Sequence, residues 1–127
     1  MSESTSRWIV IVLTIVTAVI HLSLGIGGVV MHPDTLSILF ILNGLGYFAL
    51  LAALFLSVPF FKDHRLLAHY LLIAFATVTF IAFFIVQFDN LPHVGIAAII
   101  AKADELLLIA VTSMRLRVVR PAATTQG

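Results

Sequence analysis

Hydrophobic residues dominate four long stretches of the chain, and polar residues gather mainly between them. Each stretch has the length of a membrane-spanning helix, because about 20 residues at a rise of 1.5 Å cross the roughly 30 Å hydrocarbon core of a bilayer. The pattern therefore predicts four membrane-spanning helices, over residues 8–30, 36–58, 66–88 and 94–114.

The three connections between these stretches are short, and each contains a proline: Pro33, Pro59 or Pro92. Proline marks a position where a helix stops or starts. Short connections also make sequence neighbours antiparallel neighbours in space. We therefore predict an all-α protein, an up-down-up-down four-helix transmembrane bundle. Its expected parts are an N-terminus (residues 1–7), a membrane domain (8–118) and a disordered tail (119–127).

Composition supports a protein that lives in the lipid bilayer. The chain has 127 residues, of which 61% are hydrophobic and only 10% charged, whereas soluble domains are about 25% charged. The net charge is +1, and no basic run with interleaved aromatic residues suggests a nucleic-acid partner. The chain contains no cysteine, which excludes disulfides, thiolate metal sites and cysteine catalysis.

The basic residues are distributed unevenly along the chain. All except Lys102 lie near the N-terminus, in the second connection or after the fourth stretch: Arg7, Lys62, Arg65, Arg115, Arg117 and Arg120. The first and third connections contain neither Lys nor Arg. By the positive-inside rule, this asymmetry predicts a multi-pass cell-membrane protein with both termini in the cytoplasm.

Three charged residues, Lys102, Asp104 and Glu105, lie near the centre of the fourth stretch. Each would cost roughly 2.5–3.5 kcal/mol if it faced lipid at mid-depth, so the fold must pair or hydrate them. Polar residues of the other helices reach a similar depth when they are counted from the outer helix ends. The sequence therefore predicts one polar site near the membrane centre. Its candidate residues are His21, Asn43, Tyr47, Lys102, Asp104 and Glu105.

Helical phase divides the charges of the fourth helix between two faces. Lys102 and Glu105 form an i, i+3 pair, which we expect to face the interior at the level of His21 and Asn43. Asp104 points about 200° away from Lys102. We expect Asp104 either to bond Asn43, Tyr47 or a threonine of an adjoining helix, or to lie in an exposed groove. That groove, beside Ala97 and Ala101, would suit a helix of another subunit, in a homo-oligomer or a larger membrane complex.

The connections on the expected outer side carry residues that can bind a metal: His32, Asp34, Asp89 and His93. Two histidines and two carboxylates could hold a transition metal, but ordinary hydrated loops explain them equally well, so we assign no metal site. No nucleophile–base motif, glycine-rich phosphate loop or zincin spacing occurs, which does not favour an enzyme. No cofactor is assigned from the sequence.

Four segments resemble a family of small, uncharacterised four-span prokaryotic membrane proteins: HLSLG, LSILFILNGLGYFALLA, RLLAHYLL and IAKADELLLIAV. The matching positions are His21, Leu22, Asn43, Gly44, Leu45, Gly46 and Lys102. The resemblance covers about residues 8–118. A looser similarity to DoxX-like four-helix proteins is limited to size and topology. Neither family supplies an established reaction.

Two classes of function follow from these observations. The first is a small transporter or proton-linked ligand-binding protein, in which His21, Asp104 and Glu105 exchange protons and Lys102 holds an anionic or polar ligand. The second is an accessory or assembly subunit of a larger membrane complex, joined through Ala97, Ala101 and Asp104. A quinone- or cofactor-binding redox subunit is a third alternative.

Overall fold

The computed structural model describes residues 2–119, apart from the side chains of residues 90, 93, 118 and 119. The described chain is helical and has no β-strand, which confirms the all-α prediction. Its elements are α1 (Glu3–Met31), α2 (Thr35–Phe55), α3 (Pro59–Asp63), α4 (Arg65–Val86), the 3₁₀-helix η1 (Phe88–His93) and α5 (Ile96–Val119). Residues 120–127, most of the tail expected to be disordered, lie outside the described residues.

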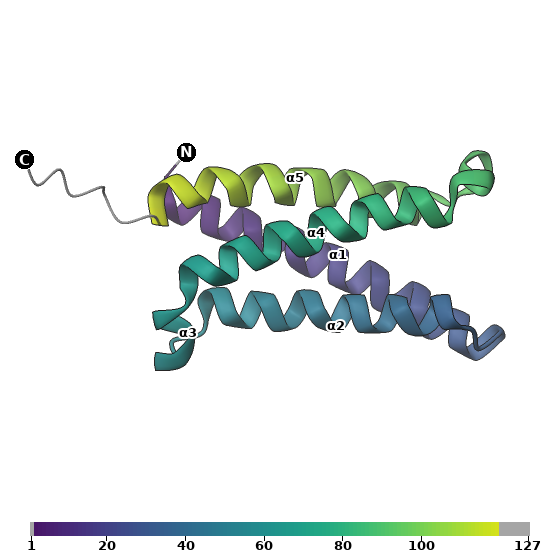
Figure 1. The fold of residues 1–127 in the computed structure, drawn as a ribbon, viewed down its shortest axis with the longest axis horizontal. Helices are drawn as coiled ribbons and strands as arrows, with labels where there is room; N and C mark the ends of the chain where they lie inside the picture. Colours follow the sequence, from purple (N-terminus) through teal and green to yellow (C-terminus); the bar gives the residue numbers. More distant parts are fainter. Residues whose placement is uncertain (1, 120–127) are drawn as a thin grey trace, which may run out of the picture.

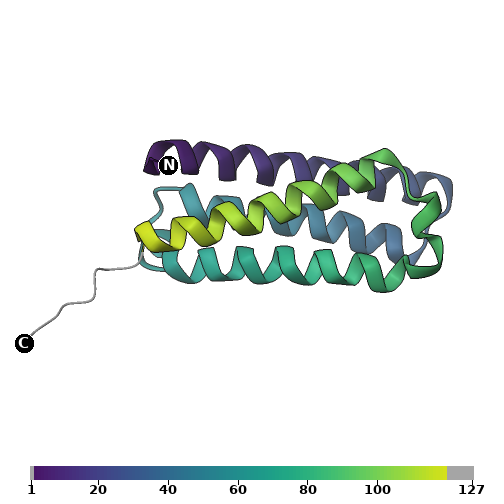
Figure 2. The same cartoon turned by 90° about the horizontal axis from the view of Figure 1, so that it is seen from above.

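Four long helices, α1, α2, α4 and α5, lie lengthwise beside one another (Figures 1 and 2). Helix α1 contacts α2 and α5, and α4 contacts the same two helices, so each long helix has two neighbours and an outer face. The short α3 joins α2 to α4 at the end of the molecule where α1 begins and α5 ends (Figure 1). The first connection and η1 are both at the opposite end of the molecule (Figure 1).

The ends of the helices differ from the expected ends for local reasons. Helix α1 begins at Glu3 rather than at residue 8, because the hydroxyl of Ser2 accepts a hydrogen bond from the Thr5 amide at 3.1 Å. Helix α2 ends at Phe55 rather than at residue 58, because Pro59 begins the separate helix α3. This single extra turn explains why five α-helices are present where four were expected.

Three of the described helices, α1, α2 and α4, are long and apolar enough to cross a membrane. Helix α5 spans 24 residues but carries the three charges Lys102, Asp104 and Glu105 in its first half. Length and composition alone therefore single out three of the four expected spans.

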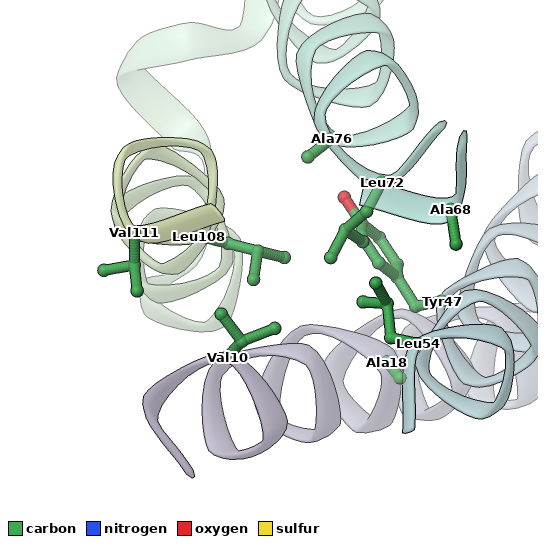
Figure 3. Close-up of a cluster of buried hydrophobic side chains, with 9 residues drawn as sticks. All are labelled: Val10, Ala18, Tyr47, Leu54, Ala68, Leu72, Ala76, Leu108 and Val111. Carbon is green, nitrogen blue, oxygen red and sulfur yellow. The ribbon is translucent and has the colours of Figure 1, made fainter. Parts of the chain in front are cut away.

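The apolar core is small and is built from all four long helices (Figure 3). Tyr47 is its largest side chain, and its ring packs edge-to-face on Phe75 with the ring centroids 4.8 Å apart. The buried members are Val10, Ala18, Tyr47, Leu54, Ala68, Leu72, Ala76, Leu108 and Val111. The core fixes how the helices face one another, and therefore which polar side chains meet.

Helices α1 and α2 approach closely where α2 carries a glycine. A Cβ atom added to Gly44 would lie 2.6 Å from Cγ of Leu22 and 2.8 Å from the carbonyl oxygen of Ala18. The backbone of α1 leaves no room for a side chain at this position. On α1, Thr14, Thr17 and His21 follow i+3 and i+4 steps along one face, and all three are buried.

We predict that Gly44→Ala lowers the free energy of unfolding by about 1–3 kcal/mol, the usual cost of overpacking. Gly27 of α1 is the matched control, because an added Cβ there meets nothing within 4 Å. Gly27→Ala should leave stability unchanged or raise it by up to about 1 kcal/mol, since alanine favours helix. Unfolding in detergent micelles measures both variants, and equal effects would contradict the close approach of α1 and α2.

Candidate functional site

The carboxylate of Glu105 is the meeting point of three helices. Glu105 of α5 is fully buried, with 0% of its surface exposed. The ammonium of Lys102, one turn earlier on α5, donates to Glu105 Oε2 at 2.6 Å. The Tyr47 hydroxyl of α2 donates to Oε1 at 3.3 Å, and His21 Nε2 of α1 lies 3.5 Å from the same oxygen. We refer to Glu105, Lys102, Tyr47 and His21 as the Glu105 cluster.

Packing orients the two rings of this cluster. Tyr47 is held between the rings of Phe75 and His21, whose centroids lie 4.8 Å and 5.8 Å from its own. The other side of His21 meets Phe40 of α2, with 5.8 Å between ring centroids. These aromatic contacts restrict the rings and aim the Tyr47 hydroxyl and His21 Nε2 at one carboxylate oxygen.

The hydrogen bonds of His21 determine where a proton must lie. His21 Nδ1 is 2.7 Å from the carbonyl oxygen of Thr17, and a carbonyl oxygen can only accept, so Nδ1 carries a proton. In a neutral ring, Nε2 is then an acceptor that faces an acceptor oxygen of Glu105. The contact is favourable only with a proton between the two atoms, either on the imidazole or on the carboxyl group. The His21–Glu105 contact could therefore take up one proton.

Lys102 connects the cluster to a cavity of about 360 Å³ between α2 and α4. The two helices diverge toward the η1 end (Figure 1). The Lys102 ammonium lies 4.8 Å from the centroid of the Phe83 ring of α4, a cation–π distance. The cavity wall is mostly apolar. Its polar residues are His21, Asn43, Thr79, Gln87 and Lys102.

Asn43 lines this cavity and does not bond to Glu105. Its amide nitrogen donates to the Thr79 hydroxyl at 2.9 Å, which joins α2 to α4. Its Oδ1 is buried and has no hydrogen-bond partner among the described residues. The structure thus brings His21, Tyr47, Lys102 and Glu105 together, and places Asn43 in the wall of the adjoining cavity.

Asp104 is buried away from the cluster. It is 6% exposed, while Lys102 is 8% exposed, because α5 packs against both α1 and α4 and so buries a wide arc of its surface. Lys102 lies on the α4 side, and Asp104 projects about 200° away from it. The prediction that Asp104 lies in an exposed groove is therefore wrong. Asp104 Oδ2 has no hydrogen-bond partner within residues 2–119.

The stripe expected to meet another subunit is only partly on the surface. Ala97 is exposed, whereas Ala101 is 2% exposed and is covered, like Asp104, by other helices of the same chain. A partner helix at Ala97, Ala101 and Asp104 remains a prediction.

The described side chains of the first connection and of η1 form no metal cluster. Among the described side chains, no three His, Cys, Asp or Glu groups gather closely enough to hold an ion, so His32, Asp34 and Asp89 do not form a site together. The side chain of His93 lies outside the described part. Asp34 instead caps α2 and accepts a hydrogen bond from the Ser37 amide at 2.7 Å. Hydrogen bonding to Ser37 holds the pKa of Asp34 below its ordinary value of 3.8.

A second polar cluster lies near the end where α1 begins, and it contains none of the predicted site residues. Arg115 of α5 is only 5% exposed. It donates to the Glu3 carbonyl at 3.1 Å, to the Ser6 hydroxyl at 3.0 Å and to His69 Nε2 at 3.4 Å, and it lies over the Phe55 ring. Arg115 thereby joins α1, α4 and α5. The sequence predicts Arg115 only as one of the cytoplasmic charges.

A signal for this second cluster was present in the spacing. Glu105, Leu108, Thr112 and Arg115 follow i+3 and i+4 steps on one face of α5, and all four are buried. A face that buries Glu105 must also bury Arg115 if the helix continues to that residue. Helix α5 does continue, to Val119, whereas the hydrophobic pattern predicts that it ends at residue 114.

Comparison with known protein families places the chain in a family. The pattern of a family of unknown function, DUF7475, matches residues 1–116. The chain belongs to this family. The match includes every member of the Glu105 cluster and agrees with the expected membership of an uncharacterised family, but it says nothing about membrane spans or DoxX-like proteins. No curated protein and no solved structure matches the chain.

A double-mutant cycle tests the Lys102–Glu105 pair. We predict that Lys102→Met and Glu105→Leu each lower the free energy of unfolding by about 3–5 kcal/mol, because each leaves a buried charge without its partner. The double variant should lose clearly less than the sum. Pairing Glu105→Leu with Lys62→Met, at an exposed lysine of α3, is the control and should be additive. Additivity within about 0.5 kcal/mol for Lys102 and Glu105, from unfolding in detergent, would contradict the pair.

Proposed function

We propose that this protein is an integral membrane protein in which α1, α2, α4 and α5 form a transmembrane four-helix bundle with a buried proton site. Three of these helices have the length and composition of membrane spans. Helix α5, the fourth, is also suited to span the membrane, because its charged residues face the other helices and its outer face is apolar.

The distribution of side chains on α5 supports the membrane environment. Ile99 and Leu107 are each 56% exposed, whereas Lys102 is 8% and Glu105 0% exposed. The same pattern holds on the other long helices, where large exposed residues include Val12, Ile26, Leu42, Val78 and Ile85. Charges inside and large hydrocarbon side chains outside suit lipid and not water.

The orientation in the bilayer follows from the charged ends. Arg7, Lys62 and Arg117 belong to the end that contains α3, the start of α1 and the end of α5 (Figure 1). The connections at the opposite end contain no Lys or Arg. The positive-inside rule places the basic end, and with it both termini, in the cytoplasm.

We further propose that the protein binds a ligand from the membrane in a proton-linked manner. The observation that carries this proposal is the double position of Lys102, which bonds Glu105 and also lines the cavity between α2 and α4. A proton on the His21–Glu105 contact weakens the hold of Glu105 on the ammonium. Ligand binding at Lys102 and proton binding at Glu105 therefore favour each other.

Infrared difference spectroscopy tests the proton site. Spectra of the protein in lipid nanodiscs, recorded between acidic and alkaline buffer, should contain a carboxyl band from Glu105 that is absent in Glu105→Gln. The band should shift in His21→Leu, because the variant removes the group that faces Oε1. Asp104→Asn separates the contribution of the neighbouring buried carboxyl, and Glu3→Gln is the control at a half-exposed carboxylate. The absence of a Glu105 band, or a band whose position does not change in His21→Leu, would contradict the proposal.

A further inference from the structure

The cavity beside Lys102 has an apolar body and a polar end. Its volume of about 360 Å³ lies within the range of sites that hold small organic molecules. Three of its lining residues, Leu39, Leu42 and Val78, are 53%, 58% and 66% exposed. The cavity is therefore open between α2 and α4 toward the surface that we assign to lipid. A molecule dissolved in the membrane can enter it sideways.

The polar end of the cavity has a simple charge balance. Lys102 is a cation, and its ion-pair partner in the described structure is Glu105. One proton on the His21–Glu105 contact makes the charges of His21 and Glu105 sum to zero, whichever of these two side chains carries it. The cluster then holds one positive charge in excess. Asp104 does not correct this locally, because it forms no ion pair with Lys102 or His21 within the described residues and points to the other side of α5.

We propose that the cavity binds a membrane-dissolved amphiphile with a single negatively charged oxygen headgroup, for which a single-chain carboxylate is the simplest form. This inference rests on the proposed proton-linked function. The headgroup takes the place of Glu105 on the Lys102 ammonium: one N–H···O bond, to Glu105 Oε2, breaks and one to the ligand forms. The Glu105 carboxyl group takes up one proton, which it shares with His21 Nε2. The ligand anion and the proton arrive together, and no covalent bond within the ligand changes.

Other headgroups fit this cavity less well. An ammonium headgroup would meet Lys102 as a like charge. A neutral carbonyl or hydroxyl group would leave the excess positive charge buried without a counter-ion. A phosphate monoester carries up to two negative charges against one cation. The apolar body of the ligand would lie along Phe40, Phe75 and Phe83, which line the cavity.

Isothermal titration calorimetry on the nanodisc-bound protein tests the inference with three probes of one chain length: tetradecanoate, tetradecanol and tetradecylamine. Tetradecanoate should bind at least about tenfold more tightly than the other two, the scale of one charged hydrogen bond. Titration in two buffers that differ in ionisation enthalpy should show the uptake of about one proton per carboxylate. Tetradecanol, or a short-chain quinone, binding as tightly as tetradecanoate would overturn the inference.

Two variants test the place of binding. Lys102→Gln should weaken tetradecanoate binding at least about tenfold, whereas Lys62→Gln, at the one other lysine of the chain, should not. Ala82→Trp replaces no member of the Glu105 cluster, and it should fill the cavity and abolish binding. Its control is Ala74→Trp, at an exposed position of α4 that does not line the cavity. Unchanged affinity in Lys102→Gln or in Ala82→Trp would overturn the assignment.

Failure of this inference is distinguishable from failure of the proposed function. Wild-type protein that shows the Glu105 carboxyl band but does not bind tetradecanoate would overturn only the ligand class. Protein that binds tetradecanoate without proton uptake, and lacks that band, would overturn the proton linkage.

Discussion

The burial of the Glu105 carboxylate is the constraint on which the rest of the structure depends. A carboxylate without water must receive hydrogen bonds from the protein or be neutralised by a proton, because its desolvation is otherwise too costly. In this chain, one donor comes from α5 itself, one from Tyr47 of α2, and His21 of α1 faces the same carboxylate. The position of one side chain on α5 thereby fixes the relative placement of three helices.

The fourth long helix plays a different part, because none of its side chains bonds Glu105 in the described structure. Helix α4 supplies Thr79 and Phe83 to the cavity wall, and the Asn43–Thr79 hydrogen bond holds it against α2 while the two helices diverge. The second polar cluster, formed by Arg115 with Glu3, Ser6 and His69, ties α4 to α1 and α5 at the opposite end. The apolar core lies between these two polar clusters. This arrangement leaves a cavity of about 360 Å³ on the side of Lys102.

The sequence predicted the long helices and most of the site, and the reasons for its failures are physical. Hydrophobic runs and helical phase are local properties, so the facing of His21 and Glu105 could be inferred from depth and spacing alone. The cavity could not be inferred from the sequence, because its size depends on how far α2 and α4 diverge. The burial of Asp104 could not be predicted because the width of the buried arc on α5 depends on its having two neighbours. The burial of Arg115 does not follow from the predicted helix, because that helix ends at residue 114, whereas α5 continues to Val119. The extra helix α3 reflects the turn at Pro59, where the hydrophobic run continues although the helix does not.

Nitrogen NMR of histidine-labelled protein in lipid tests the central claim, that His21 and Glu105 share one proton, most directly. His21→Leu identifies the signals of His21 among those of the five histidines. In acidic buffer, where the site holds its proton, the account predicts a protonated Nδ1 and an Nε2 signal that is displaced from that of a free lone pair and altered by Glu105→Gln. A protonated Nε2 with a bare Nδ1, or an Nε2 signal that Glu105→Gln leaves unchanged, would contradict it.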